Sequence, residues 1–451
     1  MRIVIVGDGK VGCTLAAQLT KEGHDLVMID KNPQALKNST DTLDVIGVQG
    51  NGASYAVQME AQVNKADLLI AATSSDEVNM LSCLLAKKLG ARHTIARIRN
   101  PEYAGQLVFL KDELGLSMAI NPEQAAAAEI SRILRFPSAT KIDVFGKGRV
   151  ELVEFRIGES NPLAGQQLSS LYARYKLKVL ICAVQRAGQI HIPGGDFVLQ
   201  QGDKVHVTAS SREISTFFRE IGLLKERIRS VLIVGGGKIS YYLARQLSDM
   251  GMRVRIIERD AQRCIELDER LPKVEMIHGD GTDQELLQEE GIADTDAFIA
   301  LTDNDEENII LSMYANGLGV KKVVTKINRI TLPDILASVG LESVILPKFI
   351  TADQIIRYVR AMQNSFGSSV ETLHKIVNNQ VEALEFIVRE NASFLHRPLR
   401  ELPLRENLLI ACLIRQGRVI IPSGSDTIEL GDNVIVITTN GQLNDISDIL
   451  R

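Results

Sequence analysis

The chain has 451 residues and a formal net charge of −5, from 51 basic and 56 acidic side chains. Its length predicts three or four domains, and a content of 45% hydrophobic and 24% charged residues is typical of a globular protein. The missing basic excess argues against a nucleic-acid partner. No apolar run reaches the roughly 18 residues that cross a bilayer, and the N-terminus lacks a signal-peptide pattern. We therefore expect a cytoplasmic protein, and any membrane role must come through a partner.

Short β-branched runs alternate with helical stretches over the first 123 residues. The expected strands are residues 3–6, 26–29, 45–48, 68–71 and 94–98, and the clearest expected helices are residues 11–22 and 77–89. Strands that alternate with helices predict βαβ units and a parallel sheet with helices on both faces. An alanine-rich segment that begins near residue 121 predicts a further helix linking this domain to the next.

A glycine-rich loop follows the first expected strand and fits the pattern G-x-G-x-x-G. It consists of Gly7, Asp8, Gly9, Lys10, Val11 and Gly12. An acid, Asp30, ends the next strand 18 residues after the last glycine, which is the spacing of a dinucleotide-binding unit. The helix N-terminus offers N–H groups to a pyrophosphate, and a carboxylate at Asp30 favours a ribose diol over a 2′-phosphate. The pattern predicts NAD or an adenosine nucleotide here; the alternative is a Rossmann turn without a ligand.

Three further candidates lie at the carboxyl edge of the same expected sheet, where open α/β folds bind ligands. Thr73 and Ser74 follow the fourth strand, and Arg97 ends the fifth. Thr73 and Ser74 are candidates for a phosphate or ribose contact. The alternative is helix capping, because Ser74, Ser75 or Asp76 could cap the helix of residues 77–89. Arg97 is a candidate phosphate contact, with a solvated surface charge as the alternative.

Residues 150 to about 220 have a different pattern. Alternating strands surround the turn signals Ala187-Gly188 and Gly202-Asp203. This pattern predicts a small α+β module.

The whole arrangement is then repeated. "IVIVGDGKVG" at residues 3–12 returns as "VLIVGGGKIS" at 231–240, and three later blocks recur at the same step of about 229 residues. A repeat of this length indicates domain duplication rather than a solenoid. We expect an α/β protein of two Rossmann-type domains, each followed by a small α+β domain, with bounds at residues 1–123, 141–225, 228–348 and 368–451.

The second copy keeps most of the candidate nucleotide-binding positions. They are Gly235, Gly237, Lys238, Ile239, Ser240, Glu258, Thr302 and Lys326. Ser240 replaces the third glycine, so this loop fits the pattern less well. The loop is expected to hold NAD, ATP or ADP, with a degenerate copy that binds nothing as the alternative.

The remaining residues with reactive side chains do not form a recognisable catalytic motif. Five cysteines without C-x-x-C spacing predict reduced, buried thiols. The seven histidines are scattered, and no G-x-S-x-G or H-E-x-x-H pattern occurs. A nucleotide-sensing regulator is therefore favoured over an NAD-dependent oxidoreductase, and a regulator of some other partner is the third interpretation. No catalytic residue and no metal site is expected.

The order of domains, together with "IVIVGDGKVG", Asp30, "ATSSDEVNM", "IARIRNPEY" and the paired "QGDKVHV" and "LGDNVIV" blocks, resembles the tandem RCK proteins, also called KTN. The resemblance covers nearly the whole chain. It implies nucleotide binding by the Rossmann-type domains and effector sensing or assembly by the smaller ones. It also implies a homo-oligomer, a dimer or a tetramer with a ring of eight RCK units, beneath a membrane potassium transporter of the TrkH or TrkG type. Ser240 departs from the pattern, which puts equivalent NAD binding in the second half in doubt.

Overall fold

The computed structural model describes the chain except for a set of short segments. These are residues 105, 160, 176–177, 224–226, 330–335, 337–338, 365–369, 377–379, 391, 393, 440–442 and 444. The chain divides into two compact units. Unit 1 combines residues 1–131 with 229–356, and unit 2 combines residues 132–228 with 357–451. Each unit therefore joins matching parts of the two sequence repeats.

The first half of unit 1 is a parallel sheet in the order β3-β2-β1-β4-β5-β6, which is the Rossmann order. Its strands are β1 (Arg2–Val6), β2 (Asp25–Asp30), β3 (Ile46–Gln49), β4 (Leu68–Ala71), β5 (His93–Arg97) and β6 (Met118–Ile120). Its helices are α1 (Lys10–Lys21), α2 (Pro33–Thr42), α3 (Tyr55–Glu60), α4 (Asp76–Leu89), α5 (Pro101–Ala104), α6 (Leu107–Glu113) and α7 (Pro122–Arg135).

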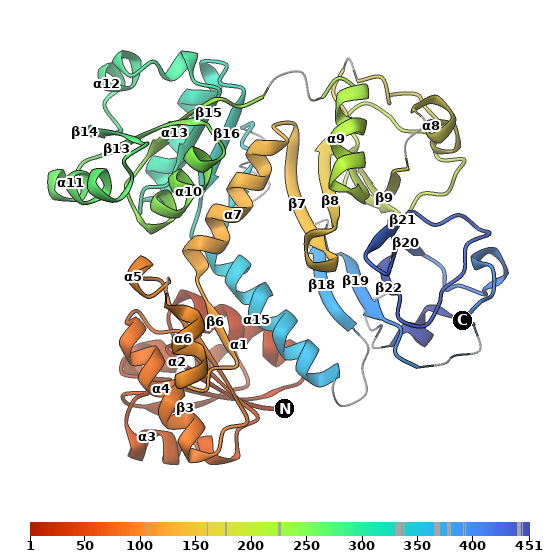
Figure 1. Cartoon of the computed structure of the whole chain (residues 1–451). Coiled ribbons are helices and arrows are strands. Elements are labelled where there is room, and N and C mark those ends of the chain that lie inside the picture. The colour runs from red at the N-terminus through yellow and green to blue at the C-terminus, as the bar shows by residue number, and fades with distance from the viewer. Residues whose placement is uncertain are drawn as a thin grey trace. The chain divides into compact units, whose positions relative to one another are not determined.

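The second half of unit 1 repeats this topology in the order β14-β13-β12-β15-β16-β17. Its strands are β12 (Ser230–Val234), β13 (Arg253–Glu258), β14 (Glu275–His278), β15 (Ala297–Ala300), β16 (Lys322–Lys326) and β17 (Val344–Ile345). Its helices are α10 (Lys238–Asp249), α11 (Ala261–Arg270), α12 (Gln284–Glu289), α13 (Asp305–Gly317) and α15 (Pro347–Asn364). Figure 1 shows α10 and α11 on one side of these strands and α12 and α13 on the other.

The parallel arrangement explains why the central strands read as continuous apolar runs. β1 and β12 lie between two strands each, so both faces are covered by helices and every residue from Ile3 to Val6 is at most 1% exposed. The predicted strands are confirmed within one residue at either end, and so are the two clearest helices. The alanine-rich segment is helix α7, which ends at Arg135.

Unit 2 contains two antiparallel sheets with the same topology, in the orders β10-β9-β11-β8-β7 and β18-β19-β22-β20-β21. The first module has β7 (Ala139–Phe145), β8 (Val150–Arg156), β9 (Leu180–Arg186), β10 (Gln189–His191) and β11 (Lys204–Ser210), with α8 (Leu168–Tyr175) and α9 (Ser211–Glu220). The second has β18 (Val370–Ile376), β19 (Val381–Ile387), β20 (Leu408–Arg415), β21 (Arg418–Ile420) and β22 (Asn433–Thr438).

The predicted turn signals of the first module take the expected geometry. Ala187 and Gly188 have positive φ angles of 49° and 82°, the pattern of a two-residue hairpin turn between β9 and β10. A shared apolar core, which includes Phe145, Leu152, Ala411 and Ile435, packs the sheets of the two modules against each other. Strand β7 was not predicted from the sequence. Among the described residues, no helix is long and apolar enough to span a membrane.

Candidate nucleotide-binding site

Both glycine loops of unit 1 open into one cavity of about 860 Å³. The cavity lies at the carboxyl edges of the two parallel sheets, the edge that the sequence predicts for ligand binding. Its described lining includes eight cationic side chains, Lys10, Lys31, Arg97, Arg99, Lys238, Arg263, Lys326 and Lys348. Three carboxylates, Asp30, Glu123 and Asp303, oppose them. An anionic ligand therefore suits this cavity, although the whole chain is acidic.

The first glycine loop has a backbone geometry that requires glycine at two positions. Gly7 adopts a φ of 101°, and a Cβ there would lie 2.9 Å from the backbone nitrogen of Thr73. A Cβ on Gly12 would lie 1.8 Å from the carbonyl oxygen of Gly7. Gly9 faces open space and is the N-cap of α1, without a side-chain cap. The first N–H groups of α1 therefore remain available to a phosphate.

Asp30 holds the first loop in place. Its carboxylate accepts hydrogen bonds from the backbone nitrogens of Asp8 at 2.6 Å and Asn32 at 2.8 Å. A ribose diol would compete with these backbone donors for the same oxygens. Asp8 itself lies beneath the loop, where the hydroxyl of Ser39 donates to it at 2.8 Å. Burial raises the pKa of Asp8, and the neighbouring Asp30 adds to this effect.

The second loop has the same carboxylate-to-backbone hydrogen bonds as the first, but different side chains surround it. Glu258 accepts hydrogen bonds from the backbone nitrogens of Gly236 at 2.5 Å and Asp260 at 2.8 Å, as Asp30 does in the first half. The hydroxyl of Ser240 donates to the carbonyl of Gly235, so the serine fits where the third glycine stood. Arg263 donates from Nε to the carbonyl of Gly236 at 3.0 Å and brings a cation to the loop.

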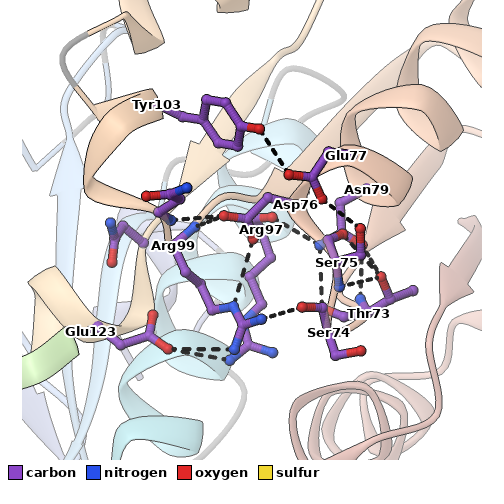
Figure 2. A network of polar contacts seen from close by, with 12 residues as sticks. Thr73, Ser74, Ser75, Asp76, Glu77, Asn79, Arg97, Arg99, Tyr103 and Glu123 are labelled. Carbon is purple, nitrogen blue, oxygen red and sulfur yellow. Dashed lines mark hydrogen bonds and ion pairs between the residues drawn. The ribbon is translucent and has the colours of Figure 1, made fainter. Parts of the chain in front are cut away.

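A buried asparagine organises the carboxyl edge of each sheet. The side chain of Asn79 accepts from the backbone nitrogen and hydroxyl of Thr73, at 2.8 and 2.7 Å, and donates to the carbonyl of Arg97 at 2.9 Å. Asn308 makes the matching bonds with Thr302 and Lys326. Figure 2 shows this network around Thr73, with Ser75 and Glu77 beside it. The hydroxyl of Thr73 is thus engaged within the protein.

A buried aspartate next to this network fixes the loop that follows the fifth strand. Asp76 accepts from the backbone nitrogens of Arg99 at 2.8 Å and Asn100 at 2.7 Å, and Asp305 does the same for residues 328 and 329. The sequence analysis did not identify Asn79, and it considered Asp76 only as a candidate helix cap. A signal for both was present, because "DE" followed two residues later by Asn recurs in "SDEVN" and "NDEEN". Of the three candidate caps, Ser75 is the N-cap of α4.

The cations that end the fifth strands are paired differently in the two halves. Arg97 lies 3.6 Å from the carboxylate of Glu123 and Arg99 lies 3.9 Å from it, as Figure 2 shows. Burial lowers the pKa of Arg97. In the second half, Lys326 lies 3.0 Å from Asp303. Lys10 and Lys238 both line the cavity.

The cysteines play no part in this site. Cys83, Cys182, Cys264 and Cys412 are buried, as expected, and burial raises the pKa of each thiol. The expectation was wrong for Cys13, which is exposed on α1 because it lies on the helix face turned away from the sheet.

Two Rossmann-type sheets, each with a glycine loop and an acid at the end of its second strand, define a tandem α/β protein of the dinucleotide-binding fold. Family models agree: the TrkA-N domain matches residues 3–122 and 231–347, and the TrkA-C domain matches residues 152–222 and 383–451. The chain therefore belongs to the TrkA family of tandem TrkA-N and TrkA-C proteins, as the resemblance to RCK proteins predicted.

Comparison with known proteins gives similar full-length matches. A Trk system potassium uptake protein TrkA homolog from Archaeoglobus fulgidus is 33% identical over 451 residues, which cover 100% of both chains. The RCK domain of GsuK has a TM-score of 0.64 at 19% identity, covering 97% of this chain and 92% of that one. The GsuK channel bound to NAD has a TM-score of 0.63 at 19% identity, covering 97% and 76%. At this identity the structures show a shared fold.

Proposed function

We propose that this protein is the nucleotide-binding regulatory subunit of a potassium uptake transporter and gates potassium flux by changing shape. The observation that carries the proposal is the single cationic cavity into which both glycine loops open. A full-length relative is a Trk system potassium uptake protein TrkA homolog, and the GsuK channel, which has the same fold, is known in a form bound to NAD. The protein works without turnover of the nucleotide, because its output is a conformation.

The two halves are proposed to take different nucleotides. In the first half the carboxylate of Asp30 accepts from the ribose diol of NAD⁺ or NADH and repels a 2′-phosphate. In the second half Arg263 adds a cation at the loop, which favours the phosphates of ATP or ADP, with NAD as the other candidate. The contacts are proposed at the backbone of Gly7, Asp8, Gly9, Lys10, Val11, Gly12, Gly235, Gly237, Lys238, Ile239 and Ser240. Side-chain contacts are proposed at Asp30, Ser74, Arg97, Glu258 and Lys326, with Thr73 and Thr302 shaping the edge.

The proposed assembly is a homo-oligomer, a dimer or a tetramer, bound at the cytoplasmic face of the inner membrane to a transporter of the TrkH or TrkG type. Matching apolar side chains support self-association. Leu81 on α4 is 52% exposed, and its counterpart Ile310 on α13 is 66% exposed. Phe109 on α6 is 65% exposed. We propose that a contact between subunits covers these side chains.

The proposed mechanism is a shift between two conformations of the assembly. A nucleotide changes their populations only through its different affinity for each. A shift from 1:99 to 99:1 requires a preference of about 10⁴-fold, or roughly 5.5 kcal/mol. Several nucleotide sites in one assembly can share this free energy at about 1 kcal/mol each.

Reconstitution with a TrkH-type transporter in liposomes tests the proposal. Potassium flux is followed with NADH, NAD⁺, ATP or ADP present, and chromatography measures the nucleotide at the end. We expect flux to depend on this protein and on the nucleotide, which remains intact. Flux that ignores the protein under every nucleotide, or NADH consumed in proportion to a substrate, would contradict the proposal and favour an oxidoreductase or another partner.

A further inference from the structure

Tyr242 connects the two halves of unit 1. It lies one turn into α10, the helix that begins at the second glycine loop with Gly237 as its N-cap. Tyr242 is only 6% exposed. The Tyr242 side chain contacts the first half of unit 1, where its hydroxyl forms two hydrogen bonds.

The geometry of these two bonds is specific. The amide nitrogen of Asn121 donates to the hydroxyl at 2.9 Å, and the hydroxyl donates to the carbonyl oxygen of Arg99 at 3.1 Å. Burial raises the pKa of Tyr242 to about 12. The hydroxyl therefore keeps its proton at neutral pH and serves as donor and acceptor at once.

Both partners of Tyr242 belong to the first half of unit 1, and both lie at or next to the cavity. Asn121 caps α7, because its side-chain oxygen accepts from the backbone nitrogen of Gln124 at 2.9 Å, and the next residue but one is Glu123. Arg99 itself lines the cavity, and its guanidinium lies 3.9 Å from the same Glu123. A movement of the Tyr242 hydroxyl would therefore reach the carboxylate that faces Arg97 and Arg99 (Figure 2).

The repeat does not duplicate this bridge, as the matching positions show. Thr14 on α1 corresponds to Tyr242, and its hydroxyl donates to the carbonyl of Lys10 within the same helix at 2.7 Å. Leu346 corresponds to Asn121, and its aliphatic side chain cannot form a hydrogen bond. The repeat thus places a polar bridge from the second loop to the first edge and gives it no polar equivalent in the opposite sense.

We propose that Tyr242 is a positioning residue that couples the two nucleotide sites. A ligand on the second loop that shifts the start of α10 moves the tyrosine hydroxyl, and with it the cap of α7 and the loop of Arg99. By thermodynamic linkage, a ligand in the first half affects the second by the same factor. This inference rests on the proposed function, namely that both loops bind nucleotides.

The test measures the affinity of the full-length protein for NADH at increasing ATP. The protein has no tryptophan, so NADH fluorescence can be followed without that background. Coupling gives a change in the Kd of NADH that reaches a plateau when ATP is saturating. We expect a change of at least fivefold in the unmodified protein, and less than twofold in the Tyr242→Phe variant. Binding of either nucleotide alone should remain within about threefold in the variant.

Tyr241→Phe is the matched control. Tyr241 is the preceding residue on α10, and its ring packs against that of Tyr242 with centroids 5.3 Å apart. This variant should keep the full change in the Kd of NADH at saturating ATP. A variant that perturbs only the packing of α10 should keep this change too. Three results would contradict the coupling but not the proposed function. They are a plateau of equal size in Tyr242→Phe, a change in the Kd of NADH that never reaches a plateau, and no change in the unmodified protein. If neither NADH nor ATP binds, the proposed function fails as well.

Discussion

The two glycine loops of unit 1 share a backbone frame, but the space beneath each loop is filled differently. Under the first loop, Ser39 donates a hydrogen bond to Asp8. Under the second, Gly236 and Leu267 take these positions, and a Cβ on Gly236 would lie 2.8 Å from a methyl group of Leu267. The polar pair is thus replaced by glycine and a large apolar residue. Because each replacement suits the other, the second loop keeps a well-packed frame.

The charged groups around the two loops also differ. The first loop lies between two carboxylates, Asp8 and Asp30, whereas the second has one carboxylate, Glu258, and the guanidinium of Arg263. At the start of the following helices, Glu123 in α7 corresponds to Lys348 in α15, and both line the cavity. One fold therefore presents a less cationic site and a more cationic site to the same space. This contrast can be broken or sharpened by substitution.

The largest effect is expected from Gly12→Ser, which gives the first loop the residue of the second. A Cβ at Gly12 would lie 1.8 Å from the carbonyl oxygen of Gly7, so the loop must move. We expect a loss of about 3 kcal/mol in unfolding free energy and a loss of NADH affinity of roughly 100-fold or more. Chemical denaturation and NADH titration measure the two effects.

The reverse substitution, Ser240→Gly, is the control. It removes one hydrogen bond and places glycine within a helix, at a cost of about 1 kcal/mol. Equal damage from the two substitutions would show that the loops do not differ as the structure indicates.

Much of this fold could be predicted from the sequence, since buried parallel strands and glycine turns leave local patterns. The positions of β1, β4 and α4 follow from apolar runs and caps that are visible in the chain. The site was harder to predict. Asn79 and Asp76 are ordinary polar residues in a helical stretch, and only the folded sheet brings them to backbone groups 18 to 24 residues away. Thr73 remains a predicted ligand contact, but the sequence does not reveal its hydrogen bonds with Asn79.

The contact between Tyr242 and Asn121 is even harder to predict from the sequence. It joins residues that are 121 positions apart and belong to different repeats. The sequence pattern of one repeat gives no information about its contacts with the other. Comparing the repeats position by position reveals a tyrosine where the first half has a threonine, but nothing in that comparison identifies its partner. Long-range pairing of this kind becomes visible only in three dimensions.

The second prediction concerns the acids that end β2 and β13. Asp30→Ala should raise the Kd of NADH roughly ten- to 150-fold, since a hydrogen bond to a charged group contributes about 1.5–3 kcal/mol. The loss includes the loop contact with the backbone of Asp8 as well as the proposed ribose contact. Asp30→Asn keeps one acceptor oxygen, so its Kd for NADH should lie between those of the unmodified protein and Asp30→Ala. Glu258→Ala should leave NADH binding in the first half nearly unchanged, and calorimetry would show whether it does.

The third prediction concerns the cation that only the second loop possesses. Arg263→Ala removes a partly exposed guanidinium, whose contribution is about 1 kcal/mol. We expect the Kd of ATP to rise about fivefold while that of NADH changes less than twofold. High salt should reduce the difference between the variant and the unmodified protein, because exposed charges are screened. A larger effect on NADH than on ATP would contradict the proposed division of nucleotides.

The smallest effect is expected from Asp8→Asn, and it depends on pH. Burial and the nearby Asp30 raise the pKa of Asp8 above its ordinary value of 3.8. A raised pKa means that the folded state favours the protonated carboxyl, so the stability linked to this group is present below about pH 4 and is lost as pH rises through the raised pKa. The asparagine variant keeps an acceptor for Ser39 and has no proton to lose. Its melting temperature should therefore improve relative to the unmodified protein as pH rises above about 4, and should stay level once the pH has passed the raised pKa of Asp8. Asp41→Asn, at an exposed position on the same helix α2, is the control and should show no such trend. If the two variants follow the same pH profile, Asp8 is not the group that distinguishes the first loop electrostatically, and the contrast depends on Arg263 and on the exchange of Glu123 for Lys348.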